Sequence, residues 1–410
     1  MSRTAFNSYT VSQARDYIVS RLPTLTTETV RIRDAVGRIL AQDIRSPLDM
    51  PAYDNSAMDG FAFHHDVLTE TDAVQLPIVG ESLAGHPYTQ SVPRGGCIRI
   101  TTGALVPDGC DTVIPWERTE STDRHVCFAS DAVRSCANVR KQGENIAKEQ
   151  IVLSKGTRIE PLHVGLLASI GVAEIPACVS PKVAVIATGD ELLQPGTPYV
   201  ENRIYNANTD LLIGLLNGMH VDYVDFGALK DDACQVRDTL SAAAKQCDLI
   251  LITGGAADSK ADISQQVIRE LGQIADWTIF MRPGHPMRFA QICDVPAFLL
   301  PGNPVAAGVT FLEFARGALL HMQGAETIWP ETSTAVTTVG IKKKSGRAEF
   351  VRARVAVDEL NRCVVTPVQD QGSASLLPLA QADVIIALDH AEEAQAGDVV
   401  TIHRLDRLVR

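Results

Sequence analysis

The sequence contains no Cys-x-x-Cys pair, and no histidine stands at zinc-ligand spacing beside its nine cysteines, which are scattered from Cys97 to Cys363. An odd number of unpaired cysteines argues against a disulfide framework and against a zinc module. Because free cysteine is among the most commonly buried residues, we interpret these as reduced thiols, with a catalytic cysteine as the less favoured alternative. The pattern favours a cytoplasmic protein.

Two further absences concern partners. No cluster of lysine and arginine is longer than Lys342–Lys344, and the formal net charge is −12, so the surface repels phosphate backbones and we expect no nucleic acid partner. Residues Met1–Tyr9 lack an apolar signal core, and the longest apolar stretch, Val305–Leu320, is interrupted by a glycine and two charged residues. We therefore expect no membrane anchor.

The length of 410 residues exceeds what one hydrophobic core usually serves, so it predicts several domains. Helical patterns at Val11–Leu22 and Val30–Leu40 return across Ile151–Pro176. Between them, prolines punctuate short apolar runs, which is typical of β structure with long loops. We therefore predict a helical linking domain formed by residues 1–45 and 146–178, interrupted by an inserted β-rich domain at 46–145.

The clearest pattern begins at Val183–Ala187, a continuous apolar run that is typical of a buried parallel strand. Strand and helix patterns then alternate, which predicts a three-layer α/β domain at 179–326. The further strands expected are Val221–Phe226, Asp248–Ile252, Trp277–Met281 and Ala297–Leu300. The expected helices are Thr209–Met219, Asp232–Lys245, Asp262–Leu271 and Val305–Leu320.

After Gly324, apolar residues alternate with period two, which predicts a small all-β barrel or sandwich at 327–410. The alternating segments are Ala335–Ile341, Glu349–Val357, Cys363–Val368, Val384–Leu388 and Val399–Ile402. The chain as a whole is thus expected to be a multi-domain protein of the α/β plus β class.

Glycine-containing turns follow three predicted strands of the α/β domain, at Thr188–Glu191, Thr253–Gly255 and Pro301–Pro304. Ligands of open α/β sheets bind beyond the carboxyl ends of the strands, where loops and helix N-termini offer unpaired N–H groups to anions. Each turn alone is explained by the geometry of a strand-to-helix connection, which often needs glycine. The three together favour an anion site.

Carboxylates are expected at the same edge of the sheet: Asp190 and Glu191 after the first predicted strand, Asp231 and Asp232 after the second, and Asp262 after the third. Hard oxygen ligands beside a phosphate cradle suit Mg²⁺. Asp232 and Asp262 each open a predicted helix, so each is also a candidate N-cap. We favour the cap for Asp232 and leave cap and ligand equally open for Asp262.

Two other segments offer polar chemistry. The stiff loop Arg282–Pro286 presents Arg282, which can clamp an oxyanion through a bidentate fork, and His285, which is more often a neutral surface residue. The dense polar loop Asp54–Gly60 is explained equally well by an Asx turn.

Five motifs follow one another along essentially the whole chain: Asp54–Gly60, Arg99–Ala104, Arg140–Ile146, Thr188–Leu192 and Leu300–Pro304. They resemble the motifs of the molybdopterin molybdenumtransferase family of the MoeA type, to which the C-terminal domain of gephyrin is related. The resemblance implies a homodimer of elongated four-domain subunits. Each subunit would have a MogA-like α/β domain that binds molybdopterin, an inserted β-rich domain, a helical linking domain and a C-terminal β-barrel. It also implies molybdenum insertion into adenylylated molybdopterin, with molybdate as a substrate, Mg²⁺ as the cofactor and AMP as a product.

The resemblance further implies roles for single residues. Asp59 and Thr102 of the partner subunit would be catalytic together with Glu191 and Asp262, and Asp232 and Asp262 would bind Mg²⁺. The substrate-binding residues would be Gly254, Gly255, Ser259, Arg282, His285, Pro301, Pro304 and Ser373.

The chain departs from the family pattern around the expected pocket. Ser259 stands where a glycine is usual, Lys260 where an acid is usual, His285 where a lysine is usual, and Asn206 where an aspartate is usual. These departures keep alternatives open: a catalytically altered paralogue that carries or scaffolds molybdopterin or its cofactor, or one that inserts tungstate. A nucleotide-processing hydrolase is disfavoured by the motifs outside the α/β domain. Molybdoenzymes or other cofactor-biosynthesis proteins are the candidate protein partners.

Overall fold

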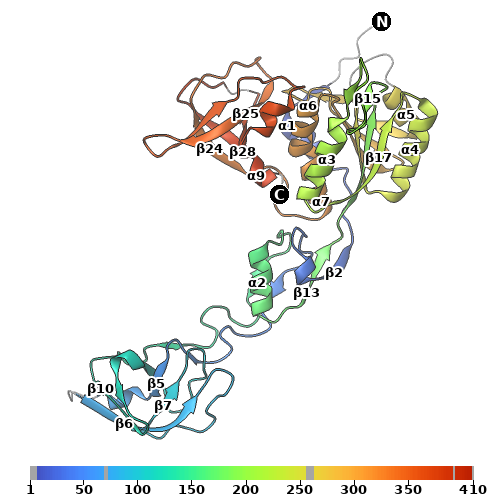
Figure 1. Cartoon of the computed structure of the whole chain (residues 1–410). Coiled ribbons are helices and arrows are strands. Elements are labelled where there is room, and N and C mark those ends of the chain that lie inside the picture. The colour runs from blue at the N-terminus through green and yellow to red at the C-terminus, as the bar shows by residue number, and fades with distance from the viewer. Residues whose placement is uncertain (1–6, 69–72, 255–262, 391–392, 409–410) are drawn as a thin grey trace. The chain divides into compact units, whose positions relative to one another are not determined.

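The computed structural model describes residues 7–68, 73–254, 263–390 and 393–408 (Figure 1). The chain folds into two compact units. The first unit comprises Met1–Gln42, Lys155–Pro161 and Glu174–Arg410, and the second unit comprises Asp43–Ser154 and Leu162–Ala173. The second unit is therefore an insertion into the sequence of the first.

A six-stranded sheet forms the centre of the second unit. Its strands, in spatial order, are β8 (Thr112–Pro115), β5 (Gly60–Phe63), β7 (Cys97–Ile100), β6 (Ala73–Ser82), β10 (His125–Ala129) and β9 (Glu120–Ser121). Two short pairs add β11 (Val139–Arg140) with β4 (Asn55–Ser56) and β12 (Ile151–Leu153) with β3 (Ile44–Arg45). Short 3₁₀ turns η2 (His65–Val67) and η3 (Trp116–Arg118) and helix α2 (Pro161–Ser169) complete it.

Strand β5 shows how this sheet is held from both sides. Phe61 and Phe63 join one apolar cluster with Phe128, whereas Ala62 joins a second cluster with Ile98. Side chains of successive strand residues point to opposite faces, so a strand of buried residues supplies two cores at once. The predicted β-rich insertion is confirmed.

The first unit contains a mixed six-stranded sheet. Its strands, in spatial order, are β17 (Asp222–Leu229), β14 (Lys182–Thr188), β18 (Leu249–Thr253), β23 (Val295–Leu300), β22 (Arg288–Ile292) and β19 (Gly272–Ile274). The first four run parallel, and β22 and β19 are antiparallel to their neighbours. One further pair, β15 (Leu192–Leu193) and β16 (Ile204–Tyr205), lies between β14 and the next helix in sequence.

Helices cover both faces of this sheet (Figure 1). One layer holds α3 (Ala207–Gly218) and the continuous helical stretch of α6 (Pro304–Thr310), the π-helical η4 (Phe311–Ala315) and α7 (Arg316–Met322), and the other holds α4 (Ala233–Gln246) and α5 (Ile263–Leu271). Val183 and Val185 face the first layer, and Ala184 and Ile186 face the second. The predicted three-layer domain is confirmed. Helix Pro304–Met322 is long and apolar enough to cross a membrane, but 89% of its apolar window is buried inside the protein, as in a core helix.

The C-terminal segment closes into a five-stranded barrel, which confirms the barrel rather than the sandwich. Its strands, in the order of pairing, are β25 (Ala348–Val357), β26 (Cys363–Pro367), β24 (Thr332–Thr337), β28 (Val399–Arg404) and β27 (Val384–Leu388), which pairs back to β25. Helices α8 (Leu376–Ala380) and α9 (Leu405–Leu408) flank it. Strand β21 (Met281–Arg282) pairs with β25, which attaches the loop Arg282–Pro286 to the barrel.

Two sequence predictions about secondary structure are wrong. The segment Val30–Leu40 is not a helix: β2 (Thr27–Arg31) pairs with β13 (Glu174–Cys178), and the 3₁₀ turn η1 (Ile32–Asp34) follows. Long-range pairing between these β-branched segments outweighs their local helical periodicity. The second wrong prediction is the helical pattern at Ile151–Pro176, where only α2 is helical. The residues before and after α2 include strands β12 and β13, which pair with distant segments of the chain.

The strand predicted at Trp277–Met281 is present, but it does not belong to the α/β sheet. Strand β20 (Trp277–Ile279) pairs with β1 (Asn7–Tyr9), next to α1 (Val11–Val19), where the rings of Tyr9 and Trp277 stack at 5.4 Å. The α/β sheet instead continues through β22, which turns into β23 at Cys293 and Asp294, both with positive φ. Such a two-residue turn usually shows Asn-Gly or Asp-Gly, so this hairpin had no sequence signal.

Candidate functional site

A cavity of about 760 Å³ opens at the carboxyl edge of the parallel strands in the first unit. All three glycine-containing turns line it, through Thr188–Gly189, Thr253–Gly254 and Pro301–Pro304. Parallel strands end at one edge of a sheet, so turns far apart in the sequence meet there. The structure therefore brings Gly254, Pro301 and Pro304 into one cavity.

At these turns, the main chains of neighbouring strand ends come close together. Gly254 has φ +91°, and a Cβ added there would lie 2.4 Å from the main-chain oxygen of Thr188. The turn after β23 is held by Asn208 at the start of α3, whose Nδ2 donates to the Gly302 oxygen at 2.8 Å. At position 254, between the ends of β14 and β18, only glycine fits. Main-chain N–H groups at such a turn are of the kind that hold phosphate oxygens.

Carboxylates gather on one side of this cavity. Glu191 and Asp231 line it, and the Asp231 N–H donates to Asp190 Oδ1 at 3.4 Å. Burial, followed by the negative charges of Asp190 and Glu191, raises the pKa of Asp231. These carboxylates give this side of the cavity a negative charge, and their oxygens are of the kind that bind Mg²⁺ together with substrate phosphates.

Asp232 is placed differently from its neighbour. Its side chain caps α4 by accepting from the Gln235 N–H at 2.7 Å, and it does not line the cavity. The cap favoured on sequence grounds is therefore observed. Asp231, rather than Asp232, faces the cavity from this turn.

A second cavity of about 300 Å³ adjoins the first and shares Pro286, Pro301 and Asn303 with it. Arg282, His285, Arg347 and Ser373 also line this smaller cavity. It carries two guanidinium groups and one imidazole, so it is suited to an oxyanion.

The barrel positions these side chains. Arg282 pairs in register with Glu349 through β21 and β25, and Arg347 Nη2 lies 2.5 Å from Glu349 Oε1. His285 Nδ1 donates to the Ile279 oxygen at 2.7 Å, which fixes the ring and leaves Nε2 as its other polar atom.

Ser373 connects the barrel to the third turn. Asn303 Nδ2 donates to Ser373 Oγ at 2.9 Å, and the Val305 N–H donates to the Ser373 oxygen at 3.1 Å. The loop from the barrel therefore closes over the start of α6, beside both cavities.

Asp59 and Thr102 come together in the second unit. Asp59 Oδ1 accepts from the Thr102 N–H at 2.6 Å and from Thr102 Oγ1 at 2.8 Å. The main-chain and hydroxyl hydrogen bonds from Thr102 lower the pKa of Asp59. Its carboxylate is therefore ionised at neutral pH and accepts hydrogen bonds only.

Four residues singled out in the sequence, Gly255, Ser259, Lys260 and Asp262, lie outside the described residues. Conversely, sequence reasoning passed over Arg347, Asn208 and Asn303, which line or support the cavities. Arg347 had no signal, since it follows an ordinary turn in the barrel. The two asparagines stand at the starts of helices, where an asparagine is usually explained as a cap.

The fold and these cavities define a class of protein: an α/β domain whose strand-end turns line a ligand cavity, in a chain that also contains an inserted β-rich unit and a barrel. Residues 184–321 match the family described as "Probable molybdopterin binding domain". Residues 9–171 match "MoeA N-terminal region (domain I and II)", and residues 334–405 match "MoeA C-terminal region (domain IV)". The chain belongs to the MoeA family of molybdopterin molybdenumtransferases, enzymes of molybdenum cofactor biosynthesis.

Individual relatives are similar to this chain over most or nearly all of its length. The chain is 34% identical over 404 residues to the molybdopterin molybdenumtransferase of Haemophilus influenzae, covering 98% of this chain and 99% of that protein. It is 30% identical over 369 residues to that of Bacillus subtilis, covering 88% and 86%. A crystal structure of the molybdopterin biosynthesis MoeA protein from Pyrococcus horikoshii OT3 is similar with a TM-score of 0.83 and 26% identity, covering 97% of this chain and all of that one.

Proposed function

We propose that this protein inserts molybdenum from molybdate into adenylylated molybdopterin and releases AMP, with Mg²⁺ as the cofactor. The observation that supports this most directly is the pair of adjoining cavities in the first unit. The larger one offers glycine turns and carboxylates, and the smaller one offers cationic side chains. A nucleotide-linked pterin and a small oxyanion need these two environments next to each other.

In the larger cavity, the turn at Gly254 and Gly255 would hold the adenylyl phosphates through main-chain N–H groups. Glu191 and Asp231, with Asp262, would hold Mg²⁺, and Asp232 would support them from its capping position. Mg²⁺ held there would supply positive charge against the phosphates during cleavage of the anhydride. The chain's own N–H groups add stabilisation of the leaving phosphate, because they are fixed before the reaction begins.

In the smaller cavity, Arg282 and Arg347 would orient molybdate, with Ser373 as a neutral hydrogen-bonding partner. His285 contributes an imidazole here whose Nδ1 is already engaged by Ile279. A neutral imidazole offers less positive charge than a lysine.

We also propose that the protein is a homodimer in which Asp59 and Thr102 of the partner subunit complete the site. Helix α2 supports this, because most of its residues are apolar and Leu162 is 84% exposed. Exposed apolar helices of this kind are typical of subunit interfaces. The four-domain division given by the sequence and a cytoplasmic location, which suits nine free cysteines, complete the proposal.

The activity is tested by incubating the purified protein with adenylylated molybdopterin, Mg²⁺ and either molybdate or tungstate, and measuring AMP. We expect release that depends on Mg²⁺ and molybdate, and its loss in Glu191→Gln and Asp262→Ala. Glu201→Gln, at an exposed position outside both cavities, is the matched control. Release only with tungstate would support the tungstate alternative, and tight pterin binding without release would support a carrier. Full Mg²⁺-dependent release by Asp262→Ala would contradict its role.

The shared site is tested by mixing two inactive variants, Asp59→Ala and Glu191→Gln, under conditions that exchange subunits. If residues of two subunits form one site, each mixed dimer contains one intact site and AMP release partly returns. No recovery, despite mixed dimers detected by mass, would mean that Asp59 and Glu191 act within one subunit. Leu162→Asp should give a folded monomer in light scattering.

A further inference from the structure

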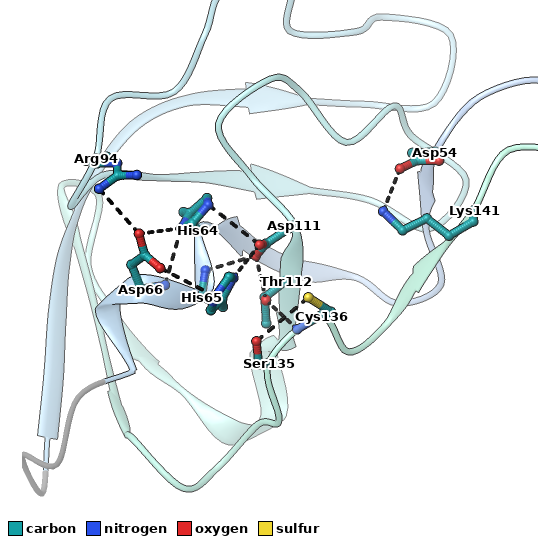
Figure 2. A network of polar contacts seen from close by, with 10 residues as sticks. All are labelled: Asp54, His64, His65, Asp66, Arg94, Asp111, Thr112, Ser135, Cys136 and Lys141. Atoms are coloured by element: carbon teal, nitrogen blue, oxygen red, sulfur yellow. Dashed lines mark hydrogen bonds and ion pairs between the residues drawn. The ribbon is translucent and has the colours of Figure 1, made fainter.

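A mixed cluster of imidazole, carboxylate and thiol groups lies in the second unit, outside the residues assigned so far. His65 comes from η2 after β5, Asp111 immediately precedes β8, and Cys136 lies in the loop between β10 and β11. One donor atom from each of these residues lies within 4.8 Å of the other two (Figure 2). Three different ligand types therefore converge from three separate segments.

The two oxygens of Asp111 have different surroundings. Oδ1 accepts from the His65 N–H at 2.9 Å and from Thr112 Oγ1 at 2.8 Å. Oδ2 lies 2.5 Å from His65 Nδ1. Hydrogen bonds to Oδ1 thus fix the carboxylate while Oδ2 points toward the imidazole.

Thr112 also fixes the cysteine. Its Oγ1 accepts from the Cys136 N–H at 2.9 Å while it donates to Asp111, so one hydroxyl connects both residues (Figure 2). Cys136 is exposed and has φ +60°, an unusual conformation for a residue other than glycine. The main-chain hydrogen bond holds the residue in this conformation, with its donor atom near Asp111 and His65.

The other ring nitrogen of His65 lies near a second carboxylate. His65 Nε2 lies 3.4 Å from Asp66 Oδ1, and Asp66 is in turn 3.4 Å from Arg94 Nη1. The ring of His64 stacks on that of His65 at 4.7 Å. A histidine that binds a metal through one ring nitrogen commonly donates its other N–H to a carboxylate, which fixes its tautomer.

We propose that the second unit binds a divalent transition metal of the Zn²⁺ class through His65 Nδ1, Asp111 Oδ2 and Cys136 Sγ, with water in the fourth position. Asp66 and Thr112 act as positioning residues behind these ligands. Nitrogen, sulfur and carboxylate oxygen together suit Zn²⁺, whereas Mg²⁺ and Ca²⁺ prefer sites made of oxygen. The site does not depend on the activity proposed for the first unit.

Binding to the imidazolium form of His65 releases two protons. The thiol S–H bond breaks as the sulfur–metal bond forms, and the Nδ1–H bond that points at Asp111 Oδ2 breaks as the nitrogen–metal bond forms; both protons go to solvent, while Nε2 keeps its proton toward Asp66. Two bonds of about 2.0 Å at a tetrahedral angle separate the nitrogen and oxygen by about 3.3 Å. The imidazole and carboxylate must therefore move apart from their present 2.5 Å. His65 is 40% exposed, so its ring has room to do so.

The competing explanation is a plain hydrogen-bonded ion pair between His65 and Asp111, with Cys136 nearby by chance. Co²⁺ separates the two, because it occupies Zn²⁺ sites and gives a near-ultraviolet thiolate band only when a cysteine sulfur binds it. The full-length protein, stripped of metal with a chelator, is titrated with Co²⁺ and then with Zn²⁺.

We expect one equivalent of Co²⁺ to produce the thiolate band, and Zn²⁺ to abolish it. Cys136→Ser should lose the band, Asp66→Asn should weaken Zn²⁺ binding about 10- to 100-fold, and Cys363→Ser, an exposed cysteine of the barrel, should bind as the original does. Zn²⁺ should also raise the melting temperature of the original protein but not that of Cys136→Ser. Absence of the band in the original protein, or its persistence in Cys136→Ser, would overturn the proposal and leave the ion pair.

Discussion

The cavity of the first unit and the polar clusters of the second unit are assembled in different ways. In the first unit, the groups follow consecutive parallel strands, so the sheet itself delivers Thr188, Thr253 and Pro301 to one edge. In the second unit, Asp59 meets Thr102 across 43 residues and His65 meets Asp111 across 46, through loops around a mainly antiparallel sheet. A site built by parallel topology is rigid at its backbone, whereas a site built by loops depends on side-chain hydrogen bonds.

The two units also differ in how they use charge. In the first unit, Glu313 is fully buried and bonds Arg15 at 2.7 Å and His403 at 2.9 Å, which joins α1, the π-helical segment and the barrel. In the second unit, Asp54 and Lys141 pair at 2.7 Å on an exposed surface. Buried charges depend on their partners far more than exposed charges do.

The strongest test of the backbone contrast compares two glycines. Gly254→Ala places a Cβ 2.4 Å from a main-chain oxygen at φ +91°, so we expect AMP release to fall about 100-fold as the turn shifts. Gly103→Ala has φ +80° but no atom within 4 Å, so it should cost only about 1–2 kcal/mol of backbone strain. Equal losses of activity in the two variants would remove the contrast.

The next largest effect concerns the buried triad. Glu313→Ala leaves Arg15 and His403 buried without their carboxylate, and we expect the free energy of unfolding of the first unit to fall by about 3–5 kcal/mol. Urea unfolding followed by Trp277 and Trp329 fluorescence measures it. Glu313→Gln, which keeps the shape of the side chain, should be destabilised less than Glu313→Ala. A change below 1 kcal/mol for Glu313→Ala would show that this buried group adds little to stability.

The exposed pair should respond much less. Lys141→Ala removes a side chain that is 58% exposed, and we expect a loss of roughly 0.2–1 kcal/mol, shrinking as salt screens the pair. Thermal unfolding at low and high ionic strength checks this. A loss as large as that of Glu313→Ala would contradict the division between buried and exposed pairs.

The smallest effect is on the titration of Asp59. Its folded pKa is lowered by Thr102, so its contribution to stability is present above the unfolded pKa and is lost as pH falls through the folded value. Thr102→Val removes the hydroxyl but keeps the N–H, so the pKa of Asp59 should rise part of the way to its ordinary value. A carboxyl NMR titration measures the shift. No change would assign the whole effect to the N–H.

Some elements of the fold could be predicted from the sequence, and others could not. The strands at Val183–Ala187 and Val384–Leu388 were recognisable because apolar runs and alternation follow directly from strand geometry. The hairpin at Cys293–Asp294 and the strand at Thr27–Arg31 were missed, since one lacks turn glycine and the other depends on a distant partner. In the site, the turns could be located from the sequence, but the residue that faces the cavity after each strand could not.

The sequence by itself determined the parallel strands, their glycine turns and hence the edge where a ligand binds, because these follow from local periodicity and backbone freedom. Tertiary structure alone decided that Asp231 faces the cavity while Asp232 caps a helix, since adjacent residues of one turn direct their side chains to different partners. It also decided that His65, Asp111 and Cys136 meet. Their spacing in the chain carries no periodicity, and only long-range strand pairing and the hydrogen bonds of Thr112 bring them together.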